Sequence, residues 1–165
     1  MIFSTAALAL ALAAGAPADD AVTLQGIGPL RDGLSLAALR SRFGATSENG
    51  PYPDPEVDCE YFRSPAYPGV SMMVSGGSVV RIDIDDRRYR TRSGARIGMT
   101  EREIRALYGR QMRVEEHPYG DADDHYLVYD ARDEPLGLIF ETTDGRATEF
   151  RVGYQDYVSL IEGCS

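Results

Sequence analysis

The sequence contains no lysine and no tryptophan, and it has only two cysteines and two histidines among its 165 residues. All 17 basic residues are therefore arginines, which excludes a lysine nucleophile or Schiff base. Acidic residues number 26, so the formal net charge is -9. A nucleic-acid partner or an anionic membrane surface is disfavoured, because both require a basic surface on the protein.

Motifs for common catalytic chemistry are also missing. No Gly-x-Ser-x-Gly elbow is present to hold a nucleophilic serine. No glycine-rich phosphate loop lies between a predicted strand and a predicted helix. The sequence therefore favours a protein that is not an enzyme, and we assign it no catalytic residue, cofactor or metal.

The longest apolar run lies at the beginning of the chain. Residues 2–18 carry no charge, end in small residues at Ala16 and Ala18, and precede a pair of aspartates. This pattern is typical of a secretory signal peptide, and the run is shorter than the roughly 20 apolar residues that span a bilayer. We predict a signal peptide over residues 1–18, cleavage near Ala18 and a periplasmic or secreted product. A retained interfacial anchor is the alternative.

Export would place the two cysteines, Cys59 and Cys164, in a compartment where disulfides persist. We expect them to form an intramolecular disulfide, which would close a loop of about 100 residues and fix the end of the chain to an interior strand. Free or intermolecular thiols are the alternative. A catalytic thiol is disfavoured, because acidic neighbours such as Asp58, Glu60 and Glu162 oppose formation of the thiolate.

An internal repeat appears when the chain is compared with itself at an offset of about 65 residues. Residues 31–44 align with residues 96–109 without a gap, and residues 77–84 align with residues 145–152 after a small insertion. The same supersecondary unit is therefore expected twice. The predicted repeats are residues 19–90 and residues 91–165.

Each repeat begins with the signals of a short helix. In the second repeat, Thr100 and Glu103 form a capping box, and Gly109 provides a stop for a helix over residues 100–108. In the first repeat, Ser35 is placed to cap a helix that ends before Gly44.

After each helix, apolar residues alternate with polar ones, which is typical of half-buried antiparallel strands. Residues 48–55 are predicted to be a loop, because three prolines remove ladder donors. Gly76-Gly77 and Asp144-Gly145 are predicted hairpin turns. The predicted strands are 57–63, 70–75 and 78–85, then 111–117, 125–130, 136–143 and 146–153.

The sum is an α+β fold: two tandem repeats, each a short helix followed by an antiparallel meander, form one sheet with both helices packed on one face. The predicted apolar face comprises Met72, Val74, Val80, Ile82, Ile84, Leu138, Phe140, Phe150 and Val152. The opposite, polar face is left to solvent. Its candidate binding residues are Arg81, Asp83, Arg113, Glu115, Glu141, Glu149 and Arg151. The alternative for these seven residues is a solvated surface with cross-strand ion pairs.

The segment from Arg96-Ile97-Gly98-Met99-Thr100 to Gly109 resembles the SmpA/OmlA (BamE-like) envelope-protein module, in which a Gly-Met-Thr turn leads into a short helix and a small antiparallel sheet. A tandem pair of such units resembles the beta-lactamase inhibitor protein architecture. That resemblance implies a concave sheet that grips a partner protein through its polar face. Two departures stand out: the chain lacks the lipid-bearing cysteine of the envelope lipoproteins, and it lacks a disulfide within each repeat.

Two segments carry competing interpretations. Residues 117–125 hold both histidines and three aspartates, which could bind zinc or calcium but are also typical of a plain hairpin loop. Residues 87–96 form a basic run that could bind an anionic partner or a lipid headgroup. Its arginines could equally pair with acidic residues of the same chain.

Three hypotheses for function follow, in order of preference. The first is a secreted or periplasmic, non-enzymatic protein-binding module, with an inhibitor as one form, that uses the polar sheet face to bind a protein partner in the envelope or extracellular space. The second is a structural or assembly protein of the SmpA/OmlA kind. The third is a metal-dependent hydrolase that uses His117 and His125.

Overall fold

The computed structural model describes residues 21–50, 58–129, 131–132 and 134–164. The predicted signal peptide and most of the predicted proline-rich loop lie outside the described residues. The strands are β1 (Val22–Thr23), β2 (Gly26–Ile27), β3 (Leu30–Arg31), β4 (Thr46–Ser47), β5 (Cys59–Arg63), β6 (Val70–Ser75), β7 (Ser78–Ile84), β8 (Met112–Glu116), β9 (His125–Tyr129), β10 (Leu136–Thr143) and β11 (Arg146–Tyr154). The helices are α1 (Leu36–Phe43), α2 (Glu101–Tyr108) and α3 (Gln155–Val158), with a 3-10 turn at Gly109–Gln111.

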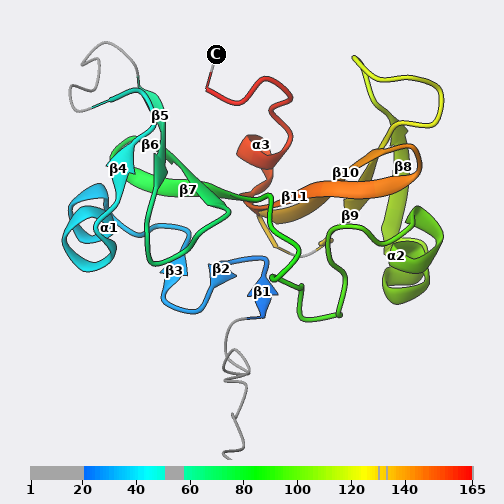
Figure 1. The fold of residues 1–165 in the computed structure, drawn as a ribbon, viewed down its shortest axis with the longest axis horizontal. Helices are drawn as coiled ribbons and strands as arrows, with labels where there is room; N and C mark the ends of the chain where they lie inside the picture. Colours follow the sequence, from blue (N-terminus) through cyan, green and yellow to red (C-terminus); the bar gives the residue numbers. More distant parts are fainter. Residues whose placement is uncertain (1–20, 51–57, 130, 133, 165) are drawn as a thin grey trace, which may run out of the picture.

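The main element is an antiparallel sheet of eight strands in the order β4-β5-β6-β7-β11-β10-β9-β8. The two predicted meanders meet at its centre, where β7 pairs with β11. A smaller sheet is built from β1, β2 and β3. In Figure 1, α1 and α2 lie on one side of the large sheet near its opposite ends, and β1–β3 lie between them. The predicted mixture of short helices with one large antiparallel sheet is thus confirmed.

The helix signals of the sequence operate as predicted. The Ser35 side chain accepts a hydrogen bond from the Ala38 amide, and α1 ends at Gly44 in the left-handed conformation. Thr100 and Glu103 form the full capping box at the start of α2. These side chains satisfy amide groups that a helix start otherwise leaves without partners. They therefore fix where each helix begins against the sheet.

The segments that lead into α1 and α2 attach to the sheet in the same manner. Gly33 donates a backbone hydrogen bond of 2.8 Å to Val79, just after the β6–β7 turn. Gly98 donates one of 2.8 Å to Ala147, just after the β10–β11 turn. Each helix is therefore anchored at its N-terminal end to one hairpin of the sheet.

The main core lies between the sheet and the layer that contains α1, α2 and β1–β3. The predicted apolar residues belong to it with one exception, Val80. The pairing of β6 with β7 shifts register between Met73 and Val74, so that Val79 rather than Val80 faces the core. Such a bulge inserts one extra residue into a strand, so the residues beyond it point to the opposite face from the one that regular alternation would give. Val80 instead lines a hollow beside α3.

The polar face of the sheet is not left entirely to solvent, which corrects the prediction. In Figure 1, α3 and the C-terminal segment lie on the side of the sheet opposite α1 and α2. Val158 of α3 is fully buried and packs with Tyr126, Val128 and Ile139. The predicted disulfide between Cys59 and Cys164 is present and joins the end of this segment to β5. The helices of the described residues include none long and apolar enough to cross a membrane.

Candidate functional site

All seven predicted binding residues lie on strands of the large sheet and point to the same face. In one row across the strands, Glu149 pairs with Glu141, Glu141 pairs with Tyr126, and Tyr126 pairs with Glu115. In the neighbouring row, Asp83 lies directly opposite Arg151. The alternation of strand residues thus places this set as predicted. The seven residues nevertheless differ widely in exposure, and this divides the face into two parts.

The first part is the buried ion pair of Arg81 and Asp83. The Arg81 side chain is 5% exposed, and its Nη2 lies 2.6 Å from an Asp83 carboxylate oxygen. Its Nη1 donates to the carbonyl oxygens of Tyr157 and Leu160, at 3.2 and 2.8 Å. Burial raises the pKa of Asp83, and the Arg81 guanidinium opposes that rise. This pair therefore holds the C-terminal segment against β7.

Arg151 has a similar role on β11. Its side chain is 3% exposed, and its Nε donates to the Val158 carbonyl at 2.7 Å. The guanidinium carbon lies 5.1 Å from the centre of the Tyr126 ring, in a cation–π arrangement. Glu141 and Glu149 lie 3.5 and 3.7 Å from its Nη1. Arg151 thus links α3 to the acidic row of the sheet.

Arg81 and Arg151 are therefore not available to a partner. The prediction that they are exposed on the polar face was wrong, because both side chains are buried. Their burial follows from the C-terminal segment, whose last backbone carbonyls would otherwise lack donors over the sheet. No buried side-chain nitrogen or oxygen atom among the described residues lacks a hydrogen-bond partner. The guanidinium groups of Arg81 and Arg151 supply donors to these backbone carbonyls, and each also pairs with a carboxylate.

The second part is an open acidic row, which we define as Glu115, Glu141 and Glu149. The Glu149 side chain is 40% exposed and that of Glu141 is 26% exposed. Partial burial and the nearby carboxylates of Glu141 and Asp83 raise the pKa of Glu149 to about 7. Like charges that face each other across two strands destabilise the sheet. The exposed Arg113 pairs with Glu115 at 2.6 Å, so Glu141 and Glu149 are left to share the one buried arginine, Arg151.

The β8–β9 hairpin flanks the acidic row with residues that the sequence did not assign to the polar face, among them His117, which it offered as a metal ligand. His117 Nε2 lies 3.0 Å from a Glu141 carboxylate oxygen, and its ring is 4.6 Å from that of Tyr126. The Tyr119 hydroxyl donates to Glu162 at 2.6 Å, which connects the hairpin to the C-terminal segment. The predicted meander makes strand 136–143 the neighbour of strand 125–130, and this adjacency is the signal that could have placed Tyr126 near Glu141.

The two histidines do not form a common metal site. His117 bonds Glu141 on the polar face, whereas His125 Nδ1 lies 2.8 Å from Glu101 at the start of α2. The histidines therefore lie on opposite faces of the sheet. Among the residues that the structure describes, no group of three or more His, Cys, Asp or Glu side chains could hold a metal ion.

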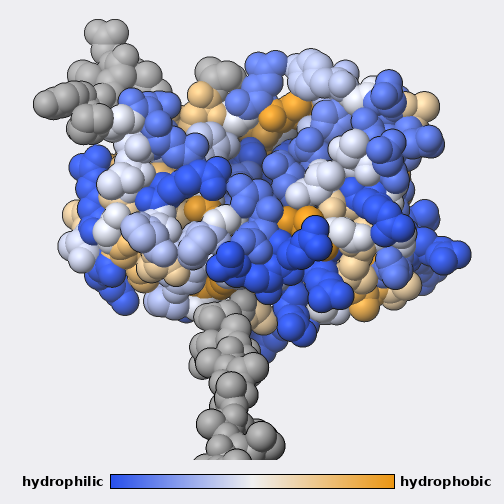
Figure 2. Space-filling model, viewed as in Figure 1, coloured by the Kyte–Doolittle hydropathy of each residue, from blue (hydrophilic) through white to orange (hydrophobic). Residues whose placement is uncertain are grey.

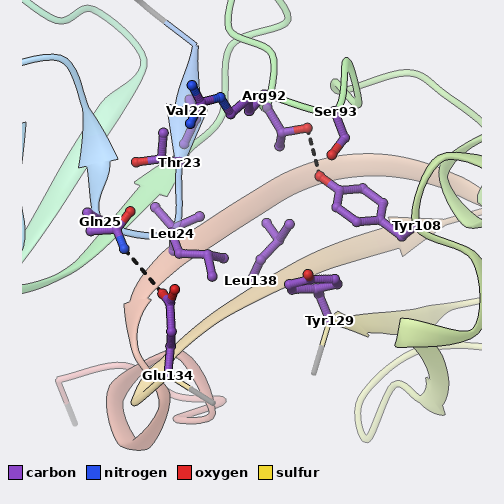
Figure 3. A pocket seen from close by; sticks show the side chains of 12 residues that line it. Val22, Thr23, Leu24, Gln25, Arg92, Ser93, Tyr108, Tyr129, Glu134 and Leu138 are labelled. Atoms are coloured by element: carbon purple, nitrogen blue, oxygen red, sulfur yellow. Dashed lines mark hydrogen bonds between the residues drawn. The ribbon is translucent and has the colours of Figure 1, made fainter. Parts of the chain in front are cut away.

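A separate pocket of about 220 Å³ opens on the helix side of the sheet (Figure 3). Leu24 and Leu138 line it with the rings of Tyr108 and Tyr129, whose centres lie 5.2 Å apart. The Tyr108 hydroxyl donates to Thr91 at 2.7 Å, which connects α2 to the segment between β7 and α2. Gln25 and Glu134 close the opposite side through a 3.2 Å hydrogen bond. The Gln25–Glu134 bond thus joins two segments that lie 109 residues apart in the sequence.

The surface in the view of Figure 2 is mostly hydrophilic, and hydrophobic residues appear there as small separate patches. Large hydrophobic side chains that are exposed in the described chain include Leu107, Val114, Tyr119, Leu160 and Ile161. They come from the helix α2, the β8–β9 hairpin and the C-terminal segment. Single exposed apolar residues are ordinary for a folded protein.

Comparisons with known proteins establish likeness of fold only. No protein family and no curated protein matches the chain. The crystal structure of the uncharacterized protein yfeY from Escherichia coli is similar, with a TM-score of 0.53 and 13% sequence identity. The match covers 81% of this chain and 99% of that chain. At this identity the likeness extends to the arrangement of the backbone and not to function.

Proposed function

We propose that this protein is an exported, non-enzymatic binding module, and that its acidic row binds a cationic segment of a partner protein in the envelope or the extracellular space. The observation that carries the proposal is the direct pairing of Glu149 with Glu141 on a partly open sheet face. Neither carboxylate is needed to hold α3, because Arg151 bonds the Val158 carbonyl itself.

The energetics of the row favour a cationic ligand. Glu141 and Glu149 share Arg151, and His117 contacts Glu141, so among the described residues Glu149 has no basic side chain within 4 Å besides the shared arginine. A lysine or arginine of a partner would relieve the repulsion between Glu141 and Glu149 and form charge-assisted hydrogen bonds with both. The Tyr126 ring, already stacked against Arg151, provides a rigid floor beneath the site.

The form of the molecule supports the same proposal. The matching attachments of Gly33 to Val79 and of Gly98 to Ala147 support the interpretation as two tandem repeats, residues 19–90 and 91–165. The resemblance to the beta-lactamase inhibitor architecture favours a sheet face as the contact surface. The Cys59–Cys164 disulfide is consistent with export after removal of residues 1–18.

The proposal is tested by affinity capture with residues 19–165 from envelope and secreted fractions. The Glu141→Gln/Glu149→Gln variant is compared with the control Glu116→Gln/Glu134→Gln, which removes the same charge outside the row. We expect a discrete protein to be retained by the wild type and the control, and to be lost by the row variant. Equal retention by all three proteins, or no specific protein with any of them, would contradict the proposal. A membrane-embedded partner would indicate the assembly role rather than inhibition.

A further inference from the structure

The structure brings together three arginines that are far apart in the sequence. Arg87 and Arg96 belong to the basic run between the repeats, and Arg146 begins β11. All three are exposed and line one pocket of about 580 Å³ with Ile97, Gly98, Met99 and Glu103. This pocket lies beside the start of α2, and none of its residues belongs to the acidic row.

The ion pairs of the described residues do not include the three arginines of this pocket. Within the basic run, Arg88 pairs with Asp86 at 2.8 Å, as one interpretation of the sequence expected. The described residues include no ion pair of Arg87, Arg96 or Arg146 with a carboxylate. Within the described part of the chain, the Arg146 side chain donates to the Gly98 carbonyl alone, at 3.0 Å, and this bond holds its guanidinium beside the pocket.

The one carboxylate in the lining, Glu103, is already engaged. It accepts hydrogen bonds from the amide and the hydroxyl of Thr100, at 2.8 and 2.7 Å. These bonds lower the pKa of Glu103, so it remains ionised and committed to the helix cap. Three guanidinium groups therefore face one carboxylate, and the pocket is locally positive in a chain of net charge -9.

The remaining walls are suited to an organic group. Ile97 and Met99 are half-buried and pack against the main core, so they present fixed apolar surface inside the pocket. Gly98 has no side chain, and a Cβ at this position would meet no atom within 4 Å. Guanidinium groups bind phosphate oxygens through paired, charge-assisted hydrogen bonds. The volume also exceeds that of a bare phosphate.

From this geometry we propose that the Arg87–Arg96–Arg146 pocket binds the phosphate group of an organic phosphate ester, with its organic part against Ile97 and Met99. Two sources share this chemistry, a soluble phosphate ester and the headgroup of a phospholipid. Because the whole molecule is acidic, it attracts anions only weakly in general. Saturable binding of a phosphate ester would therefore indicate binding at this pocket.

The test titrates residues 19–165 with glycerol phosphate by calorimetry and, separately, with vesicles of phosphatidylglycerol or of phosphatidylcholine by co-sedimentation. We expect saturable binding of glycerol phosphate or of the phosphatidylglycerol vesicles, with a dissociation constant for the free ester of about 0.1 to 1 mM. Binding of the ester alone identifies a soluble ligand. Binding of phosphatidylglycerol vesicles alone identifies a lipid headgroup.

Matched variants locate the site. The single variant Arg87→Gln should weaken binding. The double variant Arg96→Gln/Arg146→Gln should weaken it by at least about 10-fold. Arg110→Gln, an exposed arginine outside the pocket, should change binding by less than about 2-fold. The proposal is overturned if neither glycerol phosphate nor phosphatidylglycerol vesicles bind saturably. It is also overturned if Arg110→Gln weakens binding as much as the pocket variants do. The Arg87 side chain forms no hydrogen bond or ion pair with another residue that the structure describes, so the Arg87→Gln variant keeps the test valid if the double variant is destabilised.

Discussion

Glu141 and Glu149 illustrate how far residue-level prediction reached. Strand alternation and the predicted Asp144-Gly145 turn were sufficient to place both carboxylates on the polar face, and both residues of that turn have the positive φ that a tight hairpin turn of this kind requires. The exposure of individual residues could not be predicted, because Arg81 and Arg151 are covered by a segment whose position depends on tertiary contacts.

The raised pKa of Glu149 predicts a pH-dependent stability. A folded-state pKa near 7, compared with an ordinary value of 4.5, means that the protonated carboxyl favours folding below pH 4.5 and that this contribution is lost as pH rises through 7. Glu149→Gln should therefore stabilise the protein at pH 8 by about 1 kcal/mol, a value reduced for partial exposure, and should have little effect at pH 4. Urea denaturation at both pH values measures this difference. Glu116→Gln, which lies outside the row, should show no such pH dependence; a matching dependence would contradict the assignment.

The buried Arg81–Asp83 pair predicts a large asymmetric effect. Arg81→Met leaves the Asp83 carboxylate buried without its counter-charge, so it should destabilise the fold by about 3 kcal/mol. Arg81→Met/Asp83→Asn should recover part of this loss because the isolated charge is removed. Arg113→Met breaks only the exposed pair with Glu115 and should cost less than about 1 kcal/mol. Equal unfolding midpoints for Arg81→Met and Arg113→Met would show that the buried pair does not hold the C-terminal segment.

At the scale of elements, α1, α2 and seven strands of the large sheet were predictable because each has a strong local signal. Caps fix the helix ends, and alternation fixes the strands. The elements β1–β4 and α3 were not predicted, because two to four residues are too few to establish a period. The bulge that moves Val80 off the core face was also hidden, since one extra residue leaves no mark in the apolar pattern.

The capping box of α2 predicts a measurable helix-end effect. Thr100→Ala removes the acceptor for the Glu103 amide, so it should lower the free energy of unfolding by about 1 kcal/mol and the melting temperature by about 2 to 4 °C. Thr100→Ser keeps the hydroxyl and should retain most of the stability. Thermal unfolding followed by circular dichroism makes the comparison. If both variants unfold at the same temperature, the hydroxyl is not the stabilising group.

At the scale of the whole molecule, the disulfide explains why the C-terminal segment crosses the sheet. The pairing of Cys59 with Cys164 was predictable from their even number and the predicted export, but the path of the chain between them was not. Once the end of the chain is tied to β5, the residues after β11 must pass over the polar face. There they meet Arg81 and Arg151, which supply donors to their carbonyls.

Loss of this cross-link should affect global stability. The cysteines are separated by 105 residues, so the constraint on the unfolded chain is worth about 4 to 5 kcal/mol in the chain-entropy account. Cys59→Ser/Cys164→Ser should therefore unfold at markedly lower urea concentration than the wild type, and dithiothreitol should shift only the wild type. Alkylation of both cysteines without prior reduction would contradict the pairing.

The central claim is the proposal that a partner protein contacts the acidic row, and site-specific photo-crosslinking in cells that produce the protein tests it most directly. A photoreactive phenylalanine analogue replaces Glu115 at the exposed end of the row or, as the control, Arg105 on the outer side of α2. We expect a discrete protein adduct from position 115 that disappears when Glu141→Gln/Glu149→Gln is added, and none from position 105. An adduct that forms only from position 105, or no adduct from either position, would contradict the claim.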